Sequence, residues 1–452
     1  MSENNSLRKG RLILVVLILG LLLGAGWAQT ESVPYSFCVQ GGSQCLDGAD
    51  PYTAGVVLDL KGNLYGTTYY GGDGRFNCGP GCGVVFKVTP EGKETVLYSF
   101  CKQNNCPDGA WPVAGLVFDQ KGNLYGTTEY GGRPFGKACP TDGGCGVVFK
   151  LTPKGKETVL HKFCAHTKGD VCTDGAYPSA GLIIDQKGNL YGTTKTGGAI
   201  GGGVVFKLSP EGKETVLYSF CAQTNCADGA DPEAGLIFDQ KGNLYGTTRW
   251  GGAHNSRQGG GVVFKLSPEG KETVLYSFCA QTNCADGLQP RAGVVFDRKG
   301  NLYGTAGGGA YDGCYPGGSG CGVVFKLTPE NRETVLYSFC AQGGDDCTDG
   351  ANPAAGLIFD QKGDLYGTTG GGGDNNNGYC SYGGCGVVFK LTPKGKETVL
   401  HGFCAQGGCP DGAFPGAGLI FDQKGNLYGT TGNGGTYNRG VVFKLTPPSR
   451  VR

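Results

Sequence analysis

The sequence has 452 residues and a formal net charge of +1, with 88 glycines, 22 cysteines and 10% aromatic residues. This aromatic content argues against a disordered chain, and the balanced charge argues against a nucleic-acid-binding protein, which would carry a basic surface. The length is sufficient for two or three average domains or for one large repeat domain.

The first 28 residues have the pattern of a secretory signal peptide. Arg8, Lys9 and Arg11 form a basic start, residues 12–24 are apolar, and AGWAQ offers a cleavage site after Ala28. The alternative is an uncleaved anchor helix, because residues 12–28 are about long enough to span a bilayer. We therefore predict export to the periplasm, the cell surface or the medium, with no membrane attachment once the leader is cleaved.

Residues 32–38, SVPYSFC, form a short apolar run that stands alone. The same run ends six later units, as in ETVLYSFC at 94–101, whereas the last unit stops at VVFKLTPPSRVR without it. The chain therefore begins with a segment that its C-terminal unit lacks.

Internal repetition predicts the fold. The motifs LYGT and VVFK each occur seven times, and the tyrosines of LYGT are 54 to 66 residues apart. One complete unit has four runs rich in β-branched and aromatic residues, at 235–239, 243–248, 262–267 and 272–278. The turn sequences DQKGN and SPEGK separate the first run from the second and the third from the fourth, as expected for hairpins.

Seven units of four antiparallel strands predict an all-β, seven-bladed β-propeller at residues 29–447, followed by a short tail at 448–452. The last unit supplies three strands, so we predict that residues 32–38 complete it as the fourth strand and close the ring. A solenoid of stacked sheets is the alternative.

The cysteines predict eleven local disulfides in an oxidising compartment, because the members of each close pair are present or missing together. Metal binding is the alternative, but the chain has only four histidines and none lies at a matching offset. Seven predicted disulfides follow the SF run: Cys38–Cys45, Cys101–Cys106, Cys164–Cys172, Cys221–Cys226, Cys279–Cys284, Cys340–Cys347 and Cys404–Cys409. Four lie between LYGT and VVFK: Cys78–Cys82, Cys139–Cys145, Cys314–Cys321 and Cys380–Cys385.

The stretches PEAGLIFDQKGNLYGTT at 232–248 and GGGVVFKLSPEGKETVLYSF at 259–278 resemble the Gloeo/Verruco (GloVer) tandem repeat of exported bacterial proteins. They are similar, more loosely, to the NHL repeat, which has the same hairpin and strand order. The resemblance covers nearly all of residues 32–446. It implies a propeller and export, and it implies little about activity.

In a propeller, the loops between the second and third strands share one face with the links to the next blade. Here that face carries all the cysteine pairs, and its loops between LYGT and VVFK range from 9 to 18 residues. Such diversity on a uniform scaffold favours a binding function.

Two variable positions on this face are the candidate ligand contacts, because aromatic and hydrogen-bonding side chains together suit sugars or peptides. The alternative is that these residues only pack on neighbouring blades. One position precedes a proline and is occupied by Asp50, Trp111, Tyr177, Asp231, Gln289, Asn352 and Phe414. The other follows the LYGTT motif and includes Tyr69, Tyr70, Glu129, Tyr130, Lys195, Arg249 and Trp250.

The aspartates of the DG motifs are expected to bind backbone amides in their own turns, and a calcium site near the central channel is the alternative. We predict no catalytic residue and no other cofactor, since no Ser/His/Asp arrangement stands out. We expect His161 and His401, which replace the tyrosine of YSF, to be packing variants. The DG aspartates are Asp47, Asp108, Asp174, Asp228, Asp286, Asp349 and Asp411.

The sequence therefore predicts a secreted, non-catalytic binding or scaffold protein whose ligand is a glycan or a surface protein. Two alternatives stay open. One is a propeller enzyme, such as a lyase, a lactonase or a glycan-active hydrolase, that uses acids facing the channel. The other is a purely structural module of the envelope. The oligomeric state is not predicted.

Overall fold

The computed structural model describes residues 30–447, apart from 75–77, 133–138, 140–142, 255–258, 310–319, 343–346, 375–379 and 381–383. The predicted signal peptide, the tail after Pro447 and Cys314 lie outside the described residues. Within them, no helix is long and apolar enough to cross a membrane.

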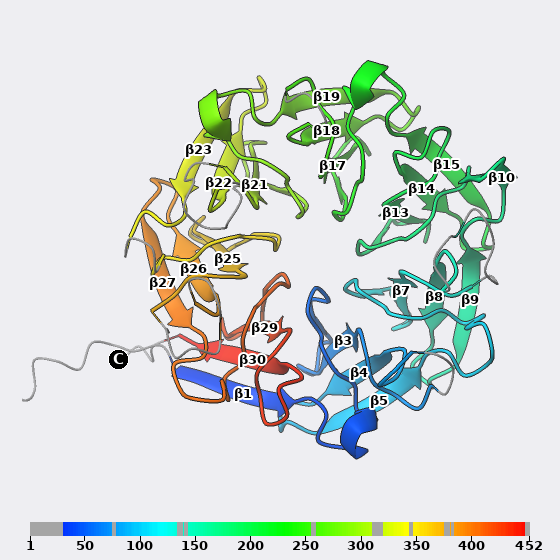
Figure 1. The fold of residues 1–452 in the computed structure, drawn as a ribbon, viewed down its shortest axis with the longest axis vertical. Helices are drawn as coiled ribbons and strands as arrows, with labels where there is room; N and C mark the ends of the chain where they lie inside the picture. Colours follow the sequence, from blue (N-terminus) through cyan, green and yellow to red (C-terminus); the bar gives the residue numbers. More distant parts are fainter. Residues whose placement is uncertain are drawn as a thin grey trace, which may run out of the picture.

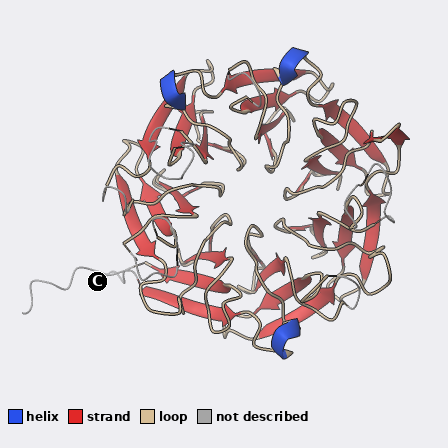
Figure 2. Cartoon of the chain, viewed as in Figure 1, coloured by secondary structure: helices blue, strands red, loops and turns tan. Residues whose placement is uncertain are grey.

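Seven four-stranded antiparallel sheets stand in a ring around a central axis, so the predicted seven-bladed propeller is confirmed (Figures 1 and 2). In blades 1 to 6 the strands run in chain order from the axis to the rim. Blades 1 to 3 contain β2 (Val57–Leu58), β3 (Leu64–Thr68), β4 (Val84–Val88) and β5 (Glu94–Ser99); β6 (Val117–Phe118), β7 (Leu124–Thr128), β8 (Val147–Leu151) and β9 (Glu157–Lys162); and β12 (Ile183–Ile184), β13 (Leu190–Thr194), β14 (Val204–Leu208) and β15 (Glu214–Ser219).

A small hairpin and three short 3₁₀ helices lie at the rim, in links between blades (Figure 2). Blades 4 to 6 repeat the four-stranded arrangement. These blades contain β16 (Ile237–Phe238), β17 (Leu244–Thr248), β18 (Val262–Leu266) and β19 (Glu272–Ser277); β20 (Val295–Phe296), β21 (Leu302–Ala306), β22 (Val323–Leu327) and β23 (Glu333–Ser338); and β24 (Ile358–Phe359), β25 (Leu365–Thr369), β26 (Val387–Leu391) and β27 (Glu397–Gly402). The hairpin and helices are β10 (Thr167–Lys168) with β11 (Val171–Cys172), η1 (Gly42–Gln44), η2 (Thr224–Cys226) and η3 (Thr282–Cys284).

Blade 7 joins the two ends of the chain. It consists of β28 (Ile420–Phe421), β29 (Leu427–Thr431), β30 (Val441–Thr446) and, at the rim, β1 (Thr30–Ser36). β1 pairs antiparallel with β30, from Thr30 opposite Thr446 to Ser36 opposite Val441, and the two strands lie side by side in Figure 1. The prediction that the N-terminal run completes the last blade is therefore confirmed.

The core lies between blades and consists mainly of phenylalanines. The phenylalanine of each VVFK motif is almost fully buried and meets, edge to face, the phenylalanine of the SF run in the preceding blade, as Phe149 meets Phe100 with ring centroids 5.0 Å apart. Gly66 of LYGT must be small, because a Cβ there would lie 2.7 Å from Cζ of Phe86. Similar edge-to-face contacts, each favourable by about 0.5–1.5 kcal/mol beyond burial, join successive blades around the ring.

The hairpins between the first two strands are held by the aspartate that ends the first strand. Asp59 accepts hydrogen bonds from the N–H groups of Lys61 and Asn63, both 2.9 Å, and from the hydroxyl of Tyr65 at 3.0 Å. Despite desolvation, the bonds from Asn63, Lys61 and Tyr65 lower the pKa of the Asp59 carboxyl. The same bonding recurs in the other blades, which supports a structural role for this face of the ring.

The innermost strands are shorter than the sequence predicts. The run expected at 235–239 forms only a two-residue strand, Ile237–Phe238. The preceding Ala–Gly step turns to the neighbouring blade instead, where the carbonyl oxygen of Ala234 accepts a hydrogen bond from Oγ1 of Thr193 at 3.1 Å. This bond recurs at every junction between blades and places the Ala–Gly steps around the axis.

Candidate functional site

The loops between the second and third strands and the links between blades share one face, which we call the loop face. Isolated antiparallel bridges join the two sets of segments in every blade, for example Ala49 with Tyr70 and Ala413 with Asn433. The positions singled out in the sequence therefore do lie together on one face of the ring.

The residue before the proline of each link has an unusual backbone. All seven have φ between 54° and 59°, which is rare for residues other than glycine and especially for Trp, Tyr and Phe. Each is fixed by a hydrogen bond to the preceding blade, as when the N–H of Trp111 donates to the carbonyl of Cys82 at 2.8 Å. Strained backbone of this kind is common at binding sites, where the surrounding structure holds it in place.

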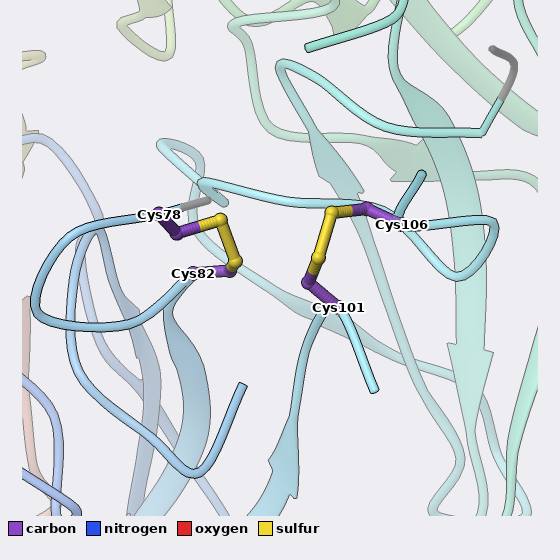
Figure 3. Close-up of side chains that lie close together, drawn as sticks. All are labelled: Cys78, Cys82, Cys101 and Cys106. Carbon is purple, nitrogen blue, oxygen red and sulfur yellow. A yellow bond between two sulfur atoms is a disulfide. The ribbon is translucent and has the colours of Figure 1, made fainter. Parts of the chain in front are cut away.

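Disulfides brace the same segments, and ten of the eleven predicted pairs are present among the described residues. In blade 1, Cys78–Cys82 lies beside Cys101–Cys106 (Figure 3), and all four sulfurs are within 4.8 Å of one another. Sulfurs in disulfide bonds offer no thiolate to a metal ion, so this proximity is a packing contact. It stiffens the loop whose carbonyl accepts the bond from Trp111.

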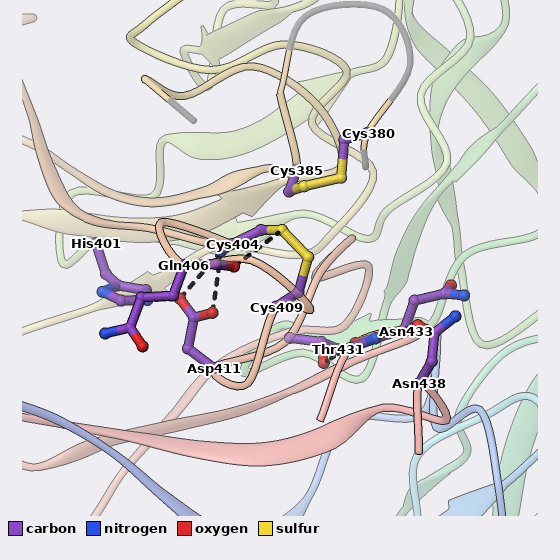
Figure 4. The surroundings of a disulfide bond; sticks show 11 residues. Cys380, Cys385, His401, Cys404, Gln406, Cys409, Asp411, Thr431, Asn433 and Asn438 are labelled. Carbon is purple, nitrogen blue, oxygen red and sulfur yellow. Dashed lines mark hydrogen bonds and ion pairs between the residues drawn. A yellow bond between two sulfur atoms is a disulfide. The ribbon is translucent and has the colours of Figure 1, made fainter. Parts of the chain in front are cut away.

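The DG aspartates hold the turns that follow the SF runs. Asp228 accepts hydrogen bonds from the hydroxyl of Tyr218 at 2.9 Å and from the N–H groups of Ala222 and Gln223 at 2.9 and 3.0 Å. In the link to blade 7, His401 takes the place of the tyrosine, and its Nε2 lies 3.1 Å from Oδ2 of Asp411 (Figure 4). The expected turn bonding is present, and the substituted histidine fills the same role.

A hollow of about 520 Å³ opens on the loop face where blades 7, 1 and 2 meet. We call it the aromatic hollow, because tyrosine and phenylalanine rings form much of its wall beside a carboxylate and an amide. It is lined by Asp50, Tyr52, Thr53, Ala54, Tyr69, Tyr70, Pro112, Val113, Phe414, Gly432 and Asn433.

The aromatic hollow coincides with a break in the repeat. Six units have a single residue between the proline and the Ala–Gly step, whereas blade 1 has two, Tyr52 and Thr53. Tyr52 lies over two glycines of blade 7, since a Cβ on Gly432 would be 2.5 Å from its ring and one on Gly416 would be 2.9 Å from its carbonyl oxygen. Thr53 donates a hydrogen bond through Oγ1 to the carbonyl of Val113 at 2.6 Å. The insertion in blade 1 and the two glycines of blade 7 thus meet at one junction of the ring, and together they shape this hollow.

A continuous row of aromatic rings extends from the hollow along blades 1 to 3. Tyr69 stacks on Trp111 with centroids 6.0 Å apart, Trp111 meets Tyr130 edge to face at 5.0 Å, and Tyr130 lies 5.4 Å from Tyr177. Trp111, Tyr130 and Tyr177 therefore mainly pack on one another, as the packing alternative anticipates. Tyr69 belongs both to this row and to the wall of the hollow.

The central channel forms a second hollow, of about 360 Å³, which we call the channel mouth. Links of all seven blades line it with small residues, and Tyr52, Thr53 and Val113 line both hollows. Charged side chains lie on one half of its rim: Glu129, Lys195, Glu233 and Arg291. Blades 6, 7 and 1 contribute no charged residue to the lining.

An ion-pair network organises these charges. Oε1 of Glu233 lies 2.8 Å from Nζ of Lys195 and 3.2 Å from a terminal nitrogen of Arg249, whose guanidinium also stacks on Trp250 at 4.9 Å. Although Glu233 is substantially desolvated, these cations hold the pKa of its carboxyl below the usual value. Burial and the charge of Glu233 raise the pKa of Asp231 to about 6.

Six of the fourteen candidate residues line one of the hollows. Asp50, Tyr69, Tyr70 and Phe414 line the aromatic hollow, and Glu129 and Lys195 line the channel mouth. The other eight line neither: Trp111, Tyr130, Tyr177, Asp231, Arg249, Trp250, Gln289 and Asn352. The residues that sequence reasoning missed are those directly after the proline, including Tyr52, Glu233 and Arg291. Their variation between units was visible in the sequence.

The profile of the Gloeobacter/Verrucomicrobia repeat matches residues 28–172, 140–381 and 317–452. No curated protein matches the sequence.

Among solved structures, a gluconolactonase from Xanthomonas campestris is 16% identical, with 75% of this chain and 88% of that chain covered and a TM-score of 0.40. A protein from Thermus thermophilus described as a glucose dehydrogenase is 16% identical, with coverage of 74% and 96% and a TM-score of 0.40. The extracellular domain of a protein described as a hybrid two-component system from B. thetaiotaomicron is 10% identical, with coverage of 86% and 38% and a TM-score of 0.49.

Proposed function

The chain belongs to the Gloeobacter/Verrucomicrobia repeat family and folds as a disulfide-braced propeller, and on this basis we propose that it is an exported, non-catalytic protein that binds a glycan in the aromatic hollow. Ten described disulfides support an oxidising compartment outside the cytosol, where such bonds persist. The predicted leader at residues 1–28 agrees with this compartment.

The observation that carries the proposal is the insertion at Tyr52 and Thr53, because it makes one of seven equivalent junctions different. Sugar rings stack their C–H faces on aromatic rings and form hydrogen bonds with carboxylates and amides at their edges. The hollow offers Tyr52, Tyr69 and Phe414 for the first kind of contact. Asp50 and Asn433 offer the second, and Oδ1 of Asp50 is buried without a hydrogen-bond partner in the described part of the chain.

Binding to a panel of oligosaccharides, followed by calorimetry on the best ligand, tests the proposal. Tyr69→Ala removes a stacking surface, and deletion of Thr53 gives blade 1 the link length of the other blades. We expect the first change to weaken binding about three- to tenfold and the second to abolish it. Asn352→Ala, at the position of Asp50 in blade 6, is the matched control and should bind like the wild type.

Equal affinities for Tyr69→Ala and Asn352→Ala would contradict the location of the site. If no oligosaccharide binds, the glycan proposal is wrong, and a protein ligand or a purely structural role becomes the better interpretation.

A second candidate function, an enzyme acting beside the channel mouth, is favoured by Asp231 and Glu233, of which Glu233 lines the mouth. Their pKa values are moved in opposite directions, which is the usual arrangement for one proton donor and one carboxylate. Turnover of a lactone or a polysaccharide that rises below about pH 6 and is lost in Asp231→Asn would support this candidate. Absence of turnover in the wild type on the same substrates would remove it.

A further inference from the structure

We propose that the channel mouth binds the carboxylate of an acidic sugar and that Arg291 is the group that pairs with it. The inference deepens the proposed glycan-binding function and rests on it. It names the ligand class as a uronate-containing oligosaccharide, whose neighbouring sugar residue occupies the aromatic hollow.

The cations at the rim differ in whether they form a direct ion pair with a carboxylate. Three cations, those of Lys195, Arg249 and Arg291, lie close enough to act on the single carboxylate of Glu233. Glu233 contacts Lys195 and Arg249 directly, at 2.8 and 3.2 Å. Arg291 lines the channel mouth and makes no ion pair or hydrogen bond with any residue that the structure describes. Its five N–H donors are therefore free for a planar anion, and guanidinium binds a carboxylate through two parallel hydrogen bonds.

Two other acids lie near these cations: Glu129, which lines the channel mouth, and Asp231, which does not. Glu129 and Asp231 interact electrostatically with Lys195 and Glu233 rather than with Arg291. Burial, the largest cause, raises the pKa of both carboxyls. Arg291 is thus the cation of this rim that has no direct carboxylate partner among the described residues.

The channel wall suits a hydroxyl-rich ligand. Six glycines, one each from blades 2 to 7, line the channel mouth, and neither their N–H nor their carbonyl groups make hydrogen bonds to described residues: Gly115, Gly181, Gly235, Gly293, Gly356 and Gly418. The alanine carbonyl before each glycine is already bound by a threonine hydroxyl, as Ala292 is by Thr247 at 2.9 Å. Hydroxyl groups both donate and accept, so a sugar can satisfy the free donors and acceptors together.

The two hollows are neighbours, which suits an extended ligand. Tyr52, Thr53 and Val113 belong to both linings, so a ligand that spans both hollows would pass over these three residues. Their volumes of about 520 and 360 Å³ are each within the usual range for small-ligand sites. The shared residues belong to blades 1 and 2, whereas Arg291 belongs to blade 5, so the two groups lie in different parts of the rim.

Calorimetry with matched acidic and neutral ligands tests the inference. The probes are tetramers of galacturonate, mannuronate and glucuronate. Each is used in the acidic form, with ionised carboxylates, and in the fully methyl-esterified, uncharged form. We expect at least one acid to bind about tenfold tighter than its ester, and Arg291→Gln to remove most of that difference. Arg291→Lys should restore part of it. Arg298→Gln, in the hairpin on the opposite face of the same blade, is the control and should leave both affinities unchanged.

Each outcome decides between the two proposals. If esters and acids bind equally well, or if Arg291→Gln binds the acid like the wild type, the acidic-sugar inference is wrong and the glycan site in the aromatic hollow stands. If no acid binds, the inference is also wrong. If neutral oligosaccharides fail as well, the proposed function falls with it. Thermal unfolding of Arg291→Gln at the wild-type temperature shows that the variant is folded.

Discussion

Closure of the ring by β1 makes Phe37 a decisive position. Phe37 is fully buried, and its ring meets Phe86 of blade 1 edge to face with centroids 5.0 Å apart. Phe37→Ala removes this contact and leaves a cavity at the junction of blades 7 and 1. For a fully buried phenylalanine the expected loss is about 3–5 kcal/mol of unfolding free energy. Denaturant unfolding followed by fluorescence measures this loss directly.

Two controls make the result interpretable. Phe163 occupies the same position within the continuous chain of blade 2 and meets Phe206 at 5.1 Å, so Phe163→Ala should cost a similar amount. Leu60 is 95% exposed, and Leu60→Ala should change the unfolding free energy by less than about 0.5 kcal/mol. If Phe37→Ala resembles Leu60→Ala rather than Phe163→Ala, the reasoning that β1 seals the ring is refuted.

Three further predictions concern stability. The free energy of unfolding should fall as the pH rises from about 5 to 9. Burial raises the pKa of Glu94 to about 8 and the pKa of five equivalent glutamates to about 7. In this range the folded protein therefore holds protons that the unfolded chain has released, so a rising pH favours the unfolded state. Glu94→Gln should flatten part of this slope, and a rise in stability over the same range would contradict the assignment. Gly66→Ala should cost about 1–3 kcal/mol, since its Cβ would lie 2.7 Å from Phe86, whereas Gly407→Ala, with no atom within 4 Å, should be neutral in the same denaturation assay. Replacing Cys78 and Cys82 by serine should lower the unfolding free energy by about 2 kcal/mol, and a melting temperature identical to that of the wild type would show that this bridge does not constrain the loop.

The sequence predicted which face of the ring and which kinds of residue form the candidate site, but not which of these residues line a hollow. The variable residues before the prolines and after LYGTT identified the loop face, and Asp50, Tyr69 and Phe414 do line a hollow there. Trp111 and Tyr130 looked equally suitable in the sequence, yet they pack mainly on neighbouring rings. Whether a loop aromatic faces a ligand or another aromatic depends on the spacing of blades, which no single repeat encodes.

The repeated strand pattern and the paired cysteines were enough to predict the fold, the ring closure and the ten disulfides of the described residues. Seven copies of one strand pattern leave few topologies, and the unmatched SVPYSFC run has one place to pair once strands are counted. Cysteines that appear and disappear together can be assigned locally, because each bond spans only a few residues.

The position of the two hollows, in contrast, depends on contacts between blades. Tyr52 matters because it lies over Gly416 and Gly432, which are more than 360 residues away in the chain and adjacent only after the ring closes. Glu233 forms ion pairs with Lys195 and Arg249, whereas Arg291 of the next blade forms none among the described residues, and this difference appears only once the blades are assembled. Repetition fixes the local geometry of each blade, whereas contacts between blades depend on which variable residues the closed ring brings together.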